Sequence, residues 1–150
     1  GYTGTTAELN YNDVTTVGTV EASKTVTADG SKVVNFADGV VQRPMLKDYS
    51  ETKVAMAAEA VDISLGNVQT YTLSGTKTLT FTNPIASGDS SSFTLIVTNG
   101  GSGTLNWPAS VDWAGSSAPD LTSSGIDVIV FTTIDGGTIW YGFSAGLDMG

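Results

Sequence analysis

The sequence predicts an all-β protein in which a short-strand N-terminal extension or shaft precedes a β-sandwich, jelly-roll-like C-terminal domain. Between Ser92 and Thr98 an apolar residue recurs at every second position, which is the period of a strand with one buried face. Similar stretches recur from Val61 to Phe143, with Gly, Asn and Asp between them. About seven or eight short strands at this spacing are typical of a β-sandwich.

Three segments follow from this pattern. Residues 1–43 are predicted to form an extended, β-rich arm or shaft, residues 44–60 a connector, and residues 61–150 the β-sandwich head. A chain of 150 residues can bury most of its apolar surface in one domain without a disulfide or a metal. The chain begins with Gly rather than Met, which predicts a processed product or part of a longer protein.

The arm holds short apolar-alternating segments separated by Asp29-Gly30 and Asp38-Gly39. Asp-Gly pairs favour tight hairpin turns because both residues tolerate positive φ. The arm has too few apolar side chains for a core of its own, so we expect it to be buried against other copies of the chain or against the next domain. Upstream, residues 7–13 are compatible with one helical turn or with a short extended piece. The expected strand segments are 17–20, 25–27, 32–36 and 40–41.

The connector combines opposing signals. Ser50 is an N-cap residue type, and Lys53–Ala60 has a helix-forming composition. Leu46, Tyr49 and Val54, however, do not form a helical stripe. Extended structure is therefore favoured.

About seven or eight strands are expected in the head, joined by turns rich in Gly and Asn, and seven of them can be placed. Gly66-Asn67, Ser74-Gly75 and Asp135–Gly137 are expected to turn the chain, and Asn99–Gly103 to form a hairpin connection. Trp113 falls in a loop rich in Gly, Ser and Pro. The expected strands are Val61–Leu65, Val68–Leu73, Thr78–Phe81, Ser92–Thr98, Leu105–Trp107, Ile126–Thr132 and Thr138–Phe143.

The composition argues against several functions. Cys and His are both absent, so the chain cannot hold a Ser-His-Asp or Cys-His catalytic arrangement, a disulfide or the usual zinc ligands. Six basic against fifteen acidic residues give a net charge of −9, the wrong sign for binding a phosphate backbone. No apolar run approaches the roughly 20 residues of a membrane span. We expect no enzyme activity, no cofactor, no nucleic-acid partner and no membrane insertion.

The carboxylates of the head could in principle form a calcium site or a pair of glycosidase acids. None of them follows the alternating Asp/Asn spacing of a calcium loop, and Asp135 is explained by its turn. We therefore predict no metal site and no catalytic residue among them. The residues considered are Asp89, Asp112, Asp120, Asp127 and Asp135.

Aromatic residues are the candidate contacts to a ligand or receptor. Trp113, Tyr141 and Trp140 could, with Trp107, form a platform for sugar rings. The alternative is that Trp107 and Trp140 are core residues of strands whose indole nitrogens are hydrogen-bonded. For Trp113, placed in a loop, both possibilities stay open.

An ordered series of short motifs resembles the C-terminal module of tailed-bacteriophage tail fibre and virion structural proteins. The resemblance covers about two thirds of the chain, and two further motifs near the N-terminus resemble linker repeats of such fibres. The head and connector motifs are Leu46–Thr52, Asp62–Val68, Leu79–Pro84, Ser92–Ile96, Trp107–Val111 and Asp135–Phe143. The N-terminal motifs are Ala7–Asn10 and Gly18–Lys24.

The resemblance implies a homotrimeric, fibre-like or capsid-decorating protein on the virion surface, outside the cell. Its partners would be two further copies of itself, other virion proteins and a host surface glycan. Trimerisation agrees with the small number of apolar side chains in the arm, because three short-stranded copies can bury their apolar faces on one another. The alternative is a monomeric carbohydrate-binding β-sandwich module. A depolymerase is disfavoured because such enzymes are usually much longer β-helices.

Overall fold

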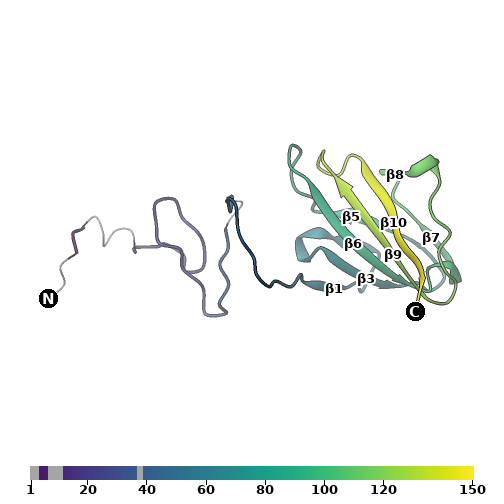
Figure 1. The fold of residues 1–150 in the computed structure, drawn as a ribbon, viewed down its shortest axis with the longest axis horizontal. Helices are drawn as coiled ribbons and strands as arrows, with labels where there is room; N and C mark the ends of the chain where they lie inside the picture. The colour runs from purple at the N-terminus through teal and green to yellow at the C-terminus, as the bar shows by residue number, and fades with distance from the viewer. Residues whose placement is uncertain (1–3, 7–11, 37–38) are drawn as a thin grey trace. The chain divides into compact units, whose positions relative to one another are not determined.

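The structure is a computed structural model, and it describes residues 4–6, 12–36 and 39–150 (Figure 1). The chain separates into two compact units, Gly1–Asp48 and Tyr49–Gly150. The alternatives for residues 7–13 and the Ala7–Asn10 motif concern a stretch of which 7–11 lie outside the described residues.

The boundary between the units lies inside the stretch 44–60 that the sequence predicts as a connector. Strand β1 (Lys53–Ala55) also falls in that stretch, and it pairs with β3 (Val68–Thr72) of the second unit. The extended structure favoured for this stretch is therefore found at β1. The compact head begins before residue 61, at Tyr49.

Turns rather than strands organise the described part of the first unit. The Asp29 carboxylate accepts hydrogen bonds from the N–H groups of Ser31, at 2.8 Å, and Val33, at 2.9 Å. An isolated parallel bridge joins Thr19 to Asn35. None of the four predicted strand segments forms a strand in this described part; at Ser31 and Val33 the Asp29 side chain satisfies the backbone locally instead. Asp38 of the second predicted turn lies outside the described residues.

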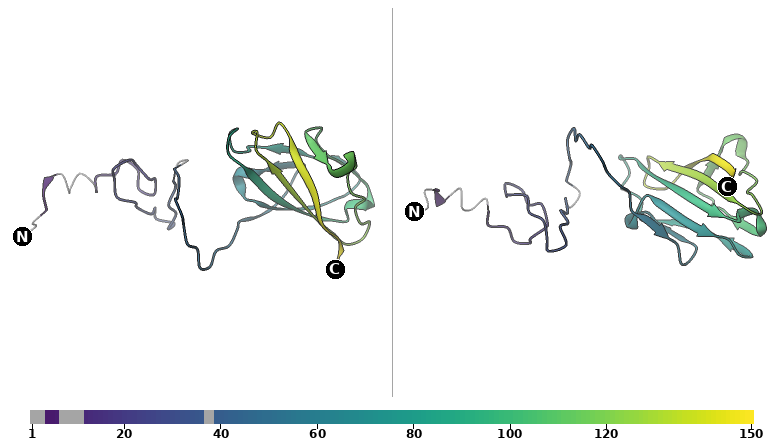
Figure 2. Two further views of the ribbon diagram at one scale, coloured as in Figure 1. Left: turned by 45° about the horizontal axis from the view of Figure 1, so that its top comes forward. Right: turned by 60° about the horizontal axis from the view of Figure 1, so that its bottom comes forward.

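The second unit consists of strands and short 3-10 turns, so the predicted all-β class is confirmed. Its main sheet has six strands in the order β1-β3-β6-β9-β10-β8. Figures 1 and 2 show the long strands β6, β9 and β10 running side by side across the unit. The bounds not yet given are Ser91–Thr98 for β6, Val111–Trp113 for β8, Ile126–Thr133 for β9 and Trp140–Met149 for β10. The 3-10 turns are η1 (Ile63–Leu65), η2 (Gly100–Ser102) and η3 (Ala114–Ser116).

Two short strand pairs accompany the main sheet. β2 (Ala60–Asp62) pairs with β5 (Thr80–Thr82), and β4 (Thr76–Thr78) pairs with β7 (Thr104–Asn106). Leu79 interrupts what the sequence predicts as one strand at Thr78–Phe81. The Leu79 N–H donates to the carbonyl of Asn106, at 2.9 Å, whereas the Thr80 N–H donates to Glu59, at 3.0 Å. The strand therefore changes partner at Leu79, from β7 to the segment that contains β2.

Most strand pairing in the second unit is parallel. Only the β6–β9 and β9–β10 pairs of residues 49–150 are antiparallel, and the other five pairs are parallel. At Gly66-Asn67 the chain passes from a short pair to the main sheet. At Ser74-Gly75, and again at Asn99–Gly103, it passes from the main sheet to a short pair. The hairpin predicted at Asn99–Gly103 is therefore wrong. Asp135–Gly137 does join two antiparallel neighbours, β9 and β10.

The core of the second unit draws side chains from the main sheet and from both short pairs. Phe93, Leu95 and Val97 of β6 are at most 2% exposed. The rings of Phe93 and Phe131 are stacked with centroids 4.9 Å apart, and Phe81 meets both edge-on at 4.9 Å. Such aromatic pairs add about 0.5–1.5 kcal/mol each beyond the area they bury. This aromatic cluster fixes the inner face of the sheet, and so determines which residues point outward.

Candidate functional site

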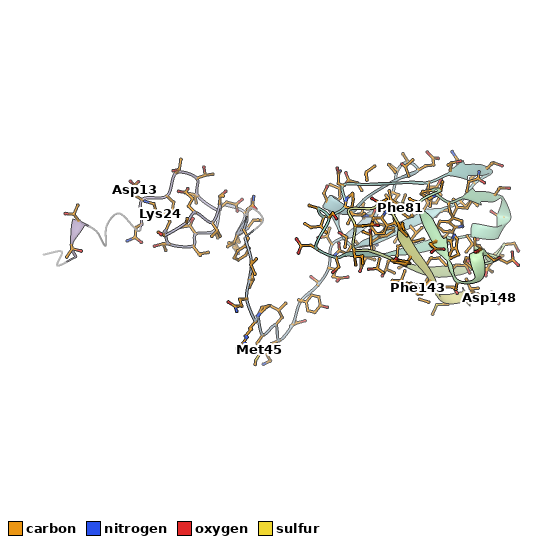
Figure 3. All side chains as sticks on the ribbon, turned by 90° about the horizontal axis from the view of Figure 1, so that it is seen from above. Asp13, Lys24, Met45, Phe81, Phe143 and Asp148 are labelled. Atoms are coloured by element: carbon orange, nitrogen blue, oxygen red, sulfur yellow. The ribbon has the colours of Figure 1, made fainter. Side chains whose placement is uncertain are left out.

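The six-stranded sheet presents a second face that points away from this core. On β6 every second residue from Phe93 to Val97 is buried, so the residues between them, such as Ile96, point the other way. Tyr141 and Phe143 of β10 are 39% and 54% exposed, and Phe143 lies on the outside of the unit (Figure 3). We call this surface the outer face. Its residues are Val68, Thr70, Thr72, Ser92, Thr94, Ile96, Thr98, Ile126, Val128, Val130, Thr132, Tyr141, Phe143 and Met149.

The strand register aligns these residues into rows across the sheet. Thr94 lies opposite Val68 on one side and Val130 on the other, and Val130 lies opposite Phe143. Directly opposed side chains on one face contact one another. The outer face is therefore a continuous surface of β-branched and aromatic side chains. The sequence carried a signal for it, because β9 is apolar at Val128 and Val130 as well as at its buried positions.

The outer face carries little charge between its two edges. In β3, β6, β9 and β10 the charged residues are Asp127, whose side chain is fully buried on the opposite face, and Asp148, which is exposed near the end of β10. Charges appear at the edges instead. Lys53 of β1 is in register with the outward-facing Val68, and Asp112 of β8 is in register with the outward-facing Tyr141. Both are exposed, so one edge is positive and the other negative.

The three predicted contact residues lie in different environments. Trp140 is 1% exposed and lies edge-on to Phe93 with centroids 5.3 Å apart, so the prediction that it contacts a ligand is wrong and Trp140 is a core residue. Trp113 lies at the end of β8 rather than in a loop. It is half-buried, with its ring 5.2 Å from Trp107 and 5.6 Å from Phe131. Tyr141 lies on the outer face.

Two shallow cavities, of about 280 and 180 Å³, adjoin Trp113. Both are lined by Trp113, Ala114, Gly142 and Phe143, and Tyr141 lines the smaller one. Gly142 makes the close approach of the indole possible, because a Cβ at this position would lie 2.7 Å from Cζ3 of Trp113. The structure thus brings the predicted residues Trp113 and Tyr141 to one cavity and leaves Trp140 in the core.

The buried carboxylate of Asp127 serves as a hydrogen-bond acceptor. It accepts from the N–H and hydroxyl of Thr122, at 2.7 and 2.8 Å, and from the N–H of Asp148, at 3.1 Å. These bonds attach the end of β10 and the loop before β9 to one side chain. Within the part of the chain that the structure describes, no group of three or more acidic residues is arranged to hold a metal ion.

Two further carboxylates stabilise turns. The Asp135 carboxylate accepts from the Ile139 N–H, at 3.0 Å, and from the Thr133 hydroxyl, at 2.8 Å. These bonds hold the pKa of Asp135 below its ordinary value, and the bond from the Ile139 N–H has the largest effect. The amide of Asn83, at 2.9 Å, and then the N–H and hydroxyl of Ser64 lower the pKa of Asp62 in the same way. Each of the two carboxylates is thus stabilised in its charged form.

The described part of the first unit leaves its large apolar side chains outside any core. Met45 is 97% exposed and Val40 is 89% exposed. Among the described residues of the first unit, only Gly18 is buried. The exposed large apolar residues of this part, which range from 41% to 97% exposed, are Val17, Val26, Val33, Phe36, Val40, Val41, Met45 and Leu46.

Comparisons with known proteins identify no relative: no family model, no curated protein and no solved structure matches the chain. Over residues 4–6, 12–36 and 39–150, no helix has the length and apolar character needed to cross a bilayer. The features from which a function can be inferred are the outer face, the exposed apolar side chains of the first unit and the two cavities at Trp113.

Proposed function

We propose that the protein is a bacteriophage virion structural protein, a homotrimeric fibre-like or capsid-decorating component exposed on the particle surface and engaged in host attachment. The observation that carries this proposal is the described part of the first unit, in which eight large apolar side chains between Val17 and Leu46 are exposed. The ordered motifs that resemble phage fibre proteins supply the biological setting.

Association of copies would bury these side chains, which the first unit by itself leaves exposed. Removing a Val, Leu or Phe side chain from water stabilises a protein by roughly 1.5–3 kcal/mol when burial is complete. Eight exposed side chains in one short unit are therefore a substantial driving force even when burial is partial.

The solution mass of the full chain tests the trimer. Light scattering is expected to give three times the 15.4 kDa of one chain, and the mass is expected to persist on dilution. Val26→Asp combined with Val33→Asp should weaken the assembly, because charges would replace apolar groups at its contacts. Ala28→Asp with Ser31→Asp adds the same charge at exposed neighbouring positions and should leave the mass unchanged. A single-chain mass for the parent protein would overturn the trimer.

The virion surface is tested separately. An antibody against the chain is expected to label the outside of intact phage particles that contain it. Particles that contain the chain but bind antibody only after disruption would overturn the surface position.

A monomeric carbohydrate-binding module is the second candidate. Trp113, Tyr141 and Phe143 around the cavities of about 280 and 180 Å³ favour it, since sugar rings stack on aromatic side chains. A single-chain mass together with specific binding on a glycan array would favour this module over the virion component.

A further inference from the structure

We propose that the outer face of β3, β6, β9 and β10 is the surface through which copies of this chain pack against one another, with Lys53 at one edge beside Asp112 of a neighbouring copy. The inference rests on the proposed function in that it requires self-association. The residues are different, however, because the trimer contact proposed above lies in the first unit and the outer face lies in the second.

The size and character of the outer face suit a covering partner. Its strands β3, β6, β9 and β10 have 5, 8, 8 and 10 residues, and at about 3.3 Å per residue and about 4.8 Å between strands they span roughly 500 Å². The largest apolar patches on monomers are typically about 300–600 Å², and a stable interface buries about 800 Å² per partner. The outer face, which combines eight apolar side chains with six of Ser and Thr, is thus within the range of such patches, and with its two edges it approaches the area of an interface.

The charge distribution favours a second copy of this chain as that partner. The chain carries a net charge of −9, so most approaches between copies bring like charges together. The outer face carries fewer charges, because Asp127 of its strands is buried on the other side and Asp148, the other charged residue of these strands, lies near the end of β10. Two such faces therefore meet with little electrostatic cost away from Asp148, and sheets of β-branched side chains pack face to face about 10 Å apart.

The edge charges determine how the copies are oriented. β1 and β8 lie at opposite ends of the strand order, so Lys53 and Asp112 mark opposite edges of the same face. A two-fold axis parallel to the strands brings the β1 edge of one copy to the β8 edge of the other. A three-fold axis parallel to the strands, with the three sheets arranged edge to edge around it, does the same. Both arrangements pair Lys53 with Asp112. A two-fold axis across the strands would instead place like charges together.

A charged substitution on the outer face tests the surface. Phe143→Glu is expected to weaken self-association of the full chain by at least about tenfold, because a buried unpaired charge costs more than the 1.4 kcal/mol that this factor represents. The measurement is the concentration dependence of mass in sedimentation or light scattering. Ile134→Glu is the matched control: Ile134 is 61% exposed against 54% for Phe143, and it follows β9 outside the outer face. Circular dichroism establishes that both variants are folded.

A charge exchange tests the orientation. Lys53→Glu and Asp112→Lys should each weaken self-association, and the two together should restore it, since opposite charges again meet at the edges. Weakening that the double variant does not reverse would overturn the pairing of Lys53 with Asp112.

The outcomes separate this inference from the proposed trimer. A trimer weakened by Phe143→Glu but not by Ile134→Glu supports both. A trimer that both variants leave intact overturns the outer face as the contact and leaves the proposed function standing. A dimer weakened by Phe143→Glu supports the outer face and overturns the trimer, whereas a single-chain mass at all concentrations overturns both.

Discussion

Single carboxylates hold together the turns of this acidic chain. Asp62 joins the end of β2 to Asn83, beyond β5, and Asp135 closes the loop between β9 and β10. In both cases neutral N–H and O–H groups donate to the carboxylate, and such bonds are roughly twice as strong when the acceptor is charged. The stability of these turns therefore depends on the ionisation of the two side chains.

We predict that the free energy of unfolding falls in acid through Asp62 and Asp135. Both folded-state pKa values are lowered, whereas an unfolded Asp titrates near 3.9. Between these values the unfolded chain binds more protons, so the contribution is present above about pH 4 and is lost as the pH falls through the lowered pKa values. Urea unfolding from pH 6 to pH 2 is expected to show a shallower decline for Asp62→Asn with Asp135→Asn. Parallel pH profiles of variant and parent would contradict this assignment.

Among the elements, strands with strong alternation were predictable and strand partners were not. Ser92–Thr98 and Ile126–Thr132 were recognised because each carries its own period-two pattern, and the structure has them within one residue, as β6 and β9. The parallel pairing of β3 with β6 joins segments about 26 residues apart, and no local pattern encodes such a partner. The sequence favoured a jelly-roll-like sandwich with a hairpin, whereas the structure alternates between the main sheet and the short pairs.

The candidate site was predictable only in part, because its residues are brought together by strand pairing. Trp113 was assigned to a loop because β8 has three residues and Gly, Ser and Pro dominate the sequence after it. Trp140 was correctly expected on a strand, but sequence alone could not decide which face it occupies. The outer face was missed because it exists only once β3, β6, β9 and β10 are aligned.

At the junction of β8 and β10, we predict that Gly142→Ala destabilises the protein by about 1–3 kcal/mol, as overpacked cores do. The new Cβ would lie 2.7 Å from the Trp113 ring, which Trp107 and Phe131 hold from other sides. Gly146→Ala on the same strand is the control, because there the Cβ meets the Met149 side chain, which is 50% exposed and free to move. Chemical denaturation measures both, and equal losses would contradict this explanation.

For the whole molecule, we predict that residues 49–150 fold without residues 1–48. Every fully buried apolar residue, from Val61 to Trp140, belongs to the second unit within the described chain. A unit of about this size typically has roughly 5–15 kcal/mol of stability. Hydrogen exchange is expected to show protected amides on β6 and β9 in the shortened chain as in the full one. Loss of that protection would mean that the first unit is required for folding.

The place of β10 in the sheet has a consequence for synthesis. β10 lies between β9 and β8, although it is the last of the described strands to leave the ribosome. Within residues 49–150 β8 pairs with β10 alone, so Val111–Trp113 must wait, already translated, until residues 140–142 emerge. A chain cut short before β10 would expose an edge of β9 and leave β8 unpaired, the kind of open edge that invites aggregation or degradation. Only a chain translated through β10 can complete the six-stranded sheet.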